Sequence, residues 1–225
     1  MTQVWATMAT IPERAGARAM AVESLLPQVD RLIVTFGHQA GDQVKFDCCR
    51  EARDVFILGV DDDLVYPPDY VERTVQGLME YGCGAVVGYH GFTLNRDGGR
   101  QDTYRCLGQV EERVQVDVIG TGVVGFHSDT LNLTPADFPT RNAAMFWVAL
   151  KAARLGLPLV VLPHDERWFP AYVEHQRTMW SETFDETGSH FDYSQTMQEP
   201  LRELIALKDW PPEPDPDEAL EEAVA

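Results

Sequence analysis

Three consecutive aspartates, Asp61, Asp62 and Asp63, directly follow the apolar segment Asp54–Val60. If the chain stays extended here, side chains alternate, and Asp61 and Asp63 point to one side with Asp62 on the other. A carboxylate pair of this kind can hold a hard divalent cation, Mn²⁺ or Mg²⁺. Such an ion usually completes its shell with substrate phosphates, so we expect a nucleotide or another phosphorylated ligand. The competing interpretation is a solvated acidic turn ahead of a helix.

Two cations and one histidine lie where they can join these carboxylates. Arg14 follows the first expected strand, Lys45 lies in the loop after the second, and His164 lies two residues after Leu159–Leu162. Ligands of open α/β sheets lie outside the carboxyl ends of the strands. Arg14 and Lys45 are therefore candidates for binding a diphosphate, and His164 for binding the metal or the phosphate. The alternative roles are a surface charge for each cation and a structural histidine for His164.

The elements that must position these groups alternate between strands and helices. Helices are expected from Thr10 to about Leu26, from Pro67 to Gly82 and over Ala143–Leu155, with Thr10 and Asn142 as N-terminal caps. Strands are expected over Gln3–Thr10, Arg31–Phe36, Asp54–Val60, Gly84–Tyr89 and Leu159–Leu162. The consecutive apolar residues Val55 to Leu58 are typical of a parallel strand covered on both faces. The pattern predicts an α/β fold with a mostly parallel central sheet, helices on both faces and a smaller antiparallel part within 91–127.

Size and charge narrow the classes of protein. The 225 residues, 44% of them hydrophobic, suit one folded domain over 1–210, followed by an acidic, proline-rich tail over 211–225 that we expect to be disordered or loosely docked. A net charge of −18 counts against nucleic acids and anionic membrane surfaces as partners. No apolar run is long enough to span a membrane, and the four cysteines lack metal-site spacing, so we expect a cytoplasmic protein with no membrane span.

Four segments in order carry a resemblance to a known family. They are Ala9–Arg14, Val22–Gln28 with Asp30–Val34, Asp61–Tyr70, and Ile119–Gly122. Together they resemble glycosyltransferases of the GT-A fold, close to the family 2 group, over roughly Val4 to Trp168. The resemblance implies a single GT-A-like, Rossmann-like domain. It also implies metal-dependent transfer of a sugar from a nucleoside-diphosphate sugar to an acceptor hydroxyl, with inversion.

The same resemblance assigns roles to individual residues. It implies nucleotide contacts from Thr10, Glu13 and Arg14, and direct metal ligation by Asp63. Asp61 and Asp62 would contact the ribose or the metal. The family's DxD motif corresponds here to Asp61-Asp62-Asp63. Lys45 lies where related sequences have a lysine before the strand that precedes this motif.

Two departures from the family pattern leave parts of the function open. Many members have an aspartate after the second strand that reads the base, and Val34–Gly37 has none, so the nucleobase is open. Related sequences also carry an acid early in the last core helix, and Asn142–Trp147 has none. Asp137 is then the first candidate for the general base, with a helix-preceding cap as its competing role, and Asp165 is the alternative base.

The acceptor is also open: a glycan, a protein or a small molecule would each fit, and so would a modified nucleic-acid base, which the net charge disfavours. Trp168 is the candidate platform for stacking an acceptor sugar.

Two other functions compete. The run Ile57–Val65 also resembles the signature of haloacid dehalogenase-type phosphatases, in which Asp61 would be the nucleophile and Asp63 the acid. That family needs a later acidic pair, which His164-Asp165-Glu166 matches poorly. The missing helix acid makes a non-catalytic nucleotide-sugar-binding protein the third alternative.

Overall fold

The computed structural model of the chain describes residues 2–37, 41–172 and 195–209. Its centre is a seven-stranded sheet with strand order β2-β1-β3-β10-β5-β11-β8. These strands are β1 (Gln3–Thr10), β2 (Arg31–Phe36), β3 (Val55–Val60), β5 (Val86–Gly88), β8 (Val114–Val116), β10 (Val123–His127) and β11 (Leu159–Val161). The pairing makes β10 and β8 antiparallel to the other five, so the sheet is mixed and mostly parallel, as expected.

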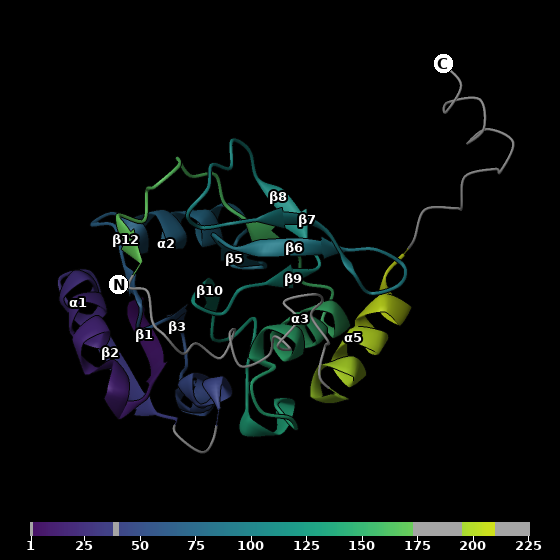
Figure 1. The fold of residues 1–225 in the computed structure, drawn as a ribbon, viewed down its shortest axis with the longest axis horizontal. Coiled ribbons are helices and arrows are strands. Elements are labelled where there is room, and N and C mark those ends of the chain that lie inside the picture. The colour runs from purple at the N-terminus through teal and green to yellow at the C-terminus, as the bar shows by residue number, and fades with distance from the viewer. Residues whose placement is uncertain (1, 38–40, 173–194, 210–225) are drawn as a thin grey trace, which may run out of the picture.

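Helices cover both faces of this sheet. Every residue of β3 is buried, and its side chains enter two separate apolar clusters, with Ile57 in one and Leu58 in the other. The helices α1 (Ala15–Leu25) and α2 (Tyr70–Glu80) pack into the cluster of Leu58, whereas α3 (Ala144–Arg154) and α5 (Gln195–Leu207) pack into that of Ile57. Figure 1 shows α1 and α5 at opposite ends of the molecule. The prediction that both faces of the third strand are covered is confirmed.

A smaller antiparallel part lies over the sheet, as the sequence predicted. The strands β6 (Gly91–Leu94), β7 (Arg100–Tyr104) and β9 (Val118–Ile119) form a three-stranded sheet in the order β7-β6-β9. A separate two-stranded pair joins β12 (Ala171–Tyr172) to β4 (Leu64–Val65). The described chain also forms 3₁₀ segments, η1 (Pro12–Arg14), η2 (Asp42–Arg50) and η3 (Pro135–Asp137).

The two helix caps expected from the sequence are wrong. The chain after β1 enters the 3₁₀ turn η1, whose N-cap residue is Ile11, and the hydroxyl of Thr10 donates to Asp62 instead. The N-cap of α3 is Ala143, while Asn142 has a φ of 57°. For Thr10 a distant segment supplies the competing partner, which a local pattern cannot reveal. For Asn142 the left-handed backbone differs from the extended conformation of an N-cap residue.

The C-terminal part contains a helix that the sequence pattern did not reveal. Leu201 and Leu204 of α5 are buried in the core, and Arg154 of α3 forms a two-bond ion pair with Glu203. The acidic tail expected over 211–225 lies outside the described residues. Within the described parts, the structure contains no helix with the length and apolarity needed to cross a membrane.

Candidate functional site

The sheet topology brings three loops to one edge. Strands β1 and β3 are parallel neighbours, so Thr10 at the end of β1 lies beside the aspartates that follow β3. Strand β10 runs antiparallel to β3, with Val123 opposite Val60, and its preceding loop therefore reaches the same edge. The first loop, the aspartate turn and the Gly120–Gly122 loop meet there, at the place where ligands of open α/β sheets bind.

Asp62 is the buried centre of this cluster, with 2% of its side chain exposed. The hydroxyl of Thr10 donates to its Oδ2 at 2.6 Å, and Nη1 of Arg14 donates to its Oδ1 at 2.8 Å. Both carboxylate oxygens are held, and the guanidinium compensates the buried charge. Asp62 therefore ties the loop after β1 to the end of β3.

Lys45 of η2 holds the second aspartate. Its side chain is 2% exposed, and its Nζ donates to Asp61 Oδ1 at 2.7 Å, with the carbonyls of Thr121 and Val60 at 3.4 and 3.5 Å. Burial alone would lower the pKa of Lys45, but the charges of Asp61 and Asp42 outweigh burial and raise it. All three N–H bonds have protein acceptors. In this arrangement the ammonium of Lys45 is bonded to protein groups and holds Asp61 in place.

A glycine and a tyrosine complete the setting of Asp61. Its backbone N–H donates to Tyr66 Oη at 2.7 Å, and that hydroxyl donates to the carbonyl of Gly122 at 2.7 Å. Burial raises the pKa of Tyr66, which keeps its proton on the ring oxygen. A Cβ on Gly122 would lie 1.8 Å from Asp61 Oδ2, so only glycine permits this approach. This contact explains the last glycine of the Gly-Thr-Gly sequence.

Asp63 lies farther from a cation than its two neighbours do. Its nearest cation is Arg14, whose Nη1 lies 3.7 Å from Oδ2, and 13% of its side chain is exposed. Burial and the charge of Asp61 raise the pKa of Asp63 to about 7 despite Arg14. Asp62 and Asp63 lie in a turn that follows Asp61, rather than in an extended strand. Arg14 contacts Asp62 and Asp63 together, while Lys45 contacts Asp61.

The structure adds a fourth carboxylate, Asp42, which the sequence analysis missed. The backbone N–H of Ala144, the first residue of α3, donates to this carboxylate, so a distant segment supplies the acid that the helix start lacks. Burial raises the pKa of Asp42, and the charge of Lys45 opposes that rise. The available signal was the spacing, because Asp42 precedes Lys45 by three residues on one 3₁₀ segment.

His164 and Trp168 occupy a neighbouring aromatic cluster. The ring nitrogens of His164 lie 2.8 Å from the carbonyl of Leu162 and 3.1 Å from that of Arg105, so backbone oxygens face both metal-binding positions. The indole N–H of Trp168 donates to Asp69 Oδ1 at 3.0 Å. Arg73 lies 4.6 Å from the ring centroid of Trp168. These contacts give both residues structural partners.

The two candidate bases have different surroundings. Asp137 accepts hydrogen bonds from Thr134 in a capping box and from Lys151 Nζ at 2.9 Å. Burial would raise the pKa of Asp137, but these donors outweigh burial and lower it. The side chain of Asp165 is exposed, and the described structure records no partner for its carboxylate. Glu13 is exposed on η1.

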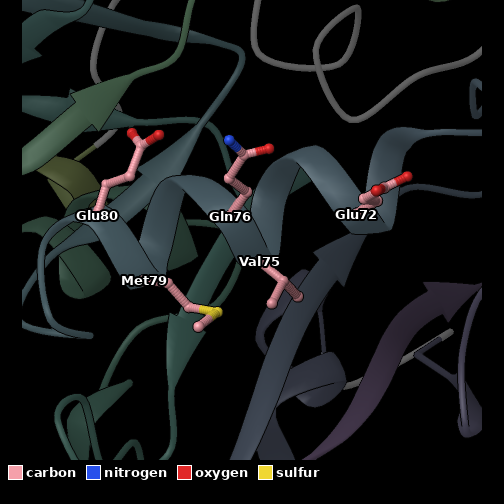
Figure 2. Close-up of a pocket in the computed structure, with 5 residues that line it drawn as sticks. All are labelled: Glu72, Val75, Gln76, Met79 and Glu80. Carbon is pink, nitrogen blue, oxygen red and sulfur yellow. The ribbon is translucent and has the colours of Figure 1, made fainter.

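A shallow hollow lies elsewhere, along the outer surface of α2 (Figure 2). Its lining residues are Glu72, Val75, Gln76, Met79 and Glu80. Two carboxylates without a lining cation make this surface unsuited to a diphosphate. The aspartate cluster therefore remains the candidate site for an anionic ligand.

Comparisons with known proteins give no family. No protein-family model matches the chain, and no curated protein matches it in sequence. Among solved structures, the chain is similar to one described as "Crystal Structure of A197 from STIV", with a TM-score of 0.47 and 13% identity over 72% of this chain and 82% of that chain. A likeness at this level carries no conclusion about function.

Proposed function

We propose that this protein is a glycosyltransferase of the GT-A type that moves a sugar from a nucleoside-diphosphate sugar to an acceptor hydroxyl, with inversion. The observation that carries the proposal is the meeting of Thr10, Arg14 and Asp61–Asp63 at the carboxyl ends of β1 and β3. These residues came from two distant sequence segments that both resemble the family. If each segment resembled the family only by chance, Thr10 of one and Asp62 of the other would have no reason to form a buried hydrogen bond.

The carboxylates suit a divalent cation, Mn²⁺ or Mg²⁺, shared with the donor. Asp62 has both oxygens bound by protein donors, which leaves Asp63 and Oδ2 of Asp61 as the oxygens to hold the ion. Mg²⁺ commonly uses one or two carboxylates and completes its shell with phosphate oxygens and water. The described residues contain no group of three or more His, Cys, Asp or Glu arranged around one point. We therefore propose that two carboxylates of the chain would hold the ion and that the diphosphate and water would complete its shell.

The chemistry requires charge compensation on the leaving group. Cleavage of the bond between sugar and diphosphate develops negative charge on the nucleoside diphosphate. A bound divalent ion supplies Lewis acidity at these oxygens. Arg14, anchored by Asp62, contributes a fixed positive charge beside them, and Lys45 keeps Asp61 in place. Thr10 and Glu13 complete the proposed nucleotide contacts.

A carboxylate must also accept the proton of the attacking hydroxyl. Of the two sequence candidates, we propose Asp165, because Asp137 is held by Thr134 and Lys151 and its pKa is lowered. Asp165 follows β11, whose carboxyl end lies at the same edge of the sheet as those of β1 and β3. Trp168 stays the proposed contact for the acceptor. The acceptor itself is a glycan, a protein or a small molecule.

Calorimetry with nucleoside diphosphates, with and without Mn²⁺, tests the binding part of this proposal. We expect Mn²⁺-dependent binding by the wild-type protein. Replacement of Thr93, a surface residue of β6 bonded to Asp102, with alanine is a matched control outside the site. If no nucleoside diphosphate binds, the proposed function is wrong.

Hydrolysis assays separate the competing functions. A transferase slowly hydrolyses a nucleotide sugar in the presence of Mn²⁺ or Mg²⁺, whereas a phosphatase cleaves simple phosphate esters. A binding protein does neither. Cleavage of a phosphate ester with Asp61 as the nucleophile would show that the protein is a phosphatase and that our proposal is wrong.

A further inference from the structure

An exposed aromatic ring stands beside the proposed donor site. Phe36 is the last residue of β2 and lies opposite Thr10 of β1 in the parallel register. The backbone N–H of Gly37 donates to the carbonyl of Thr10 at 2.9 Å, which holds this strand end against the loop that carries Arg14. Phe36 is nevertheless 58% exposed. A large apolar ring thus borders a polar site at its outer edge.

A guanidinium lies over this ring. Cζ of Arg18 in α1 is 5.0 Å from the centroid of Phe36. Its Nη1 reaches the hydroxyl of Thr10 and the carbonyl of Ile11 only at 3.5 Å each, and the described structure records no carboxylate paired with it. An arginine that lies over an aromatic ring keeps its planar fork of donors, and the outer edge of that fork can bind a further group. The pair therefore offers a flat surface together with a fork of hydrogen-bond donors.

These features select among nucleobases. An aromatic surface binds any base by stacking, and a larger base covers more of it. A fork of donors fits a base edge with two neighbouring acceptors. Guanine presents O6 and N7 in that way, and cytosine presents N3 and O2 but offers a smaller surface for stacking. Adenine pairs N7 with an amino donor, and the edge of uracil places an N–H between its carbonyls. Segment 34–37 has no acid that would accept the uracil N–H.

We infer that Phe36 and Arg18 bind the guanine base of the donor, Phe36 by stacking and Arg18 by donating to O6 and N7. This inference rests on the proposed function and names the nucleotide of the same site. Thr10 links the two parts, because its hydroxyl bonds Asp62 on one side and lies 3.5 Å from Arg18 on the other. The base site and the diphosphate site are thus neighbours on the loop after β1.

Calorimetry with GDP, ADP, UDP and CDP in the presence of Mn²⁺ tests the inference. We expect GDP to bind at least 10-fold more tightly than ADP, UDP or CDP. Phe36→Ala should weaken GDP binding by about 5- to 150-fold, the range measured for stacking of a base on an aromatic side chain. Phe36→Trp should retain it. Arg18→Lys should reduce the preference for GDP over ADP, because a lysine lacks the planar fork.

A matched control is Met79→Ala, which removes an equally exposed apolar side chain from α2 and should leave GDP binding unchanged. Equal or tighter binding of ADP, UDP or CDP, or unchanged GDP binding by Phe36→Ala, would overturn the inference while the proposed function stands. Loss of binding in Phe36→Trp as well as in Phe36→Ala would also count against stacking. Absence of binding to all four diphosphates would instead reject the proposed function itself.

Discussion

Gly122→Ala is the substitution that most directly tests the geometry of the aspartate cluster. The added Cβ would lie 1.8 Å from Oδ2, 2.2 Å from Cγ and 2.9 Å from Oδ1 of Asp61, and these are its three nearest atoms. Contacts this short require one group to move. The side chain of Asp61 is 46% exposed and can turn outward, whereas Gly122 is backbone between a buried threonine and β10. Asp61 should therefore leave its position.

The cost of that movement comes from Lys45. Its side chain is 2% exposed, and its ammonium would lose its shortest hydrogen bond, which is 2.7 Å long. Removing one partner of a fully buried ion pair costs about 3–5 kcal/mol, and an exposed pair contributes about 0–1 kcal/mol. This pair is half-exposed on the Asp61 side, and Asp42 remains beside Lys45. We therefore expect a destabilisation of about 2 kcal/mol, or a fall in Tm of about 4–8 °C for a chain of this size.

Thermal unfolding of four proteins measures the effect: wild type, Gly122→Ala, Asp61→Ala and the double variant. If the methyl acts through Asp61, it should cost little in the Asp61→Ala background, and the two changes should not add. Gly16→Ala is the control, because a Cβ there meets no atom within 4 Å and alanine favours the helix. Additive losses, or an unchanged Tm in Gly122→Ala, would refute the reasoning.

Three further predictions follow from the same site and its surroundings. Asp63→Ala should abolish Mn²⁺-dependent binding of a nucleoside diphosphate in calorimetry, and undiminished binding would remove Asp63 from the metal site. Asp165→Asn should lower donor turnover at least 100-fold without changing nucleotide affinity, whereas Asp137→Asn should lower Tm and leave turnover; the reverse pattern would make Asp137 the base. Burial, with help from Arg100 and Arg105, lowers the pKa of His90 to about 4. The unfolded chain thus binds a proton below about pH 6.5 that the folded state rejects, so stability is present above that pH and falls by up to about 3 kcal/mol as the pH drops to 4. In urea unfolding, the free energy of unfolding of His90→Gln should vary less with pH across that window than that of the wild type. An unchanged dependence on pH would contradict the lowered pKa of His90.

Local sequence determined most of the elements and their order. Consecutive apolar residues at 55–58 predicted a strand buried on both faces, and the first, second and last core strands agree with the structure within a residue. The reason is that burial on one or two faces imposes a short-range periodicity that the chain itself displays. The sequence pattern did not predict the helix over Gln195–Leu207, which contains Pro200, a residue that normally interrupts a helix.

Tertiary structure alone decided which partners the polar groups take. Thr10 could cap its own helix or bond Asp62, and the parallel pairing of β1 with β3 decided for Asp62. In the same way, the packing of η2 against the start of α3 brought Asp42 to a helix that has no acid of its own. Hydrogen bonds and ion pairs depend on atoms within about 3 Å, and residues separated by 50 or 100 positions reach that distance only once the sheet has formed. The sequence therefore determined that an acidic cluster follows β3, and the fold decided that Arg14 and Lys45 would divide it.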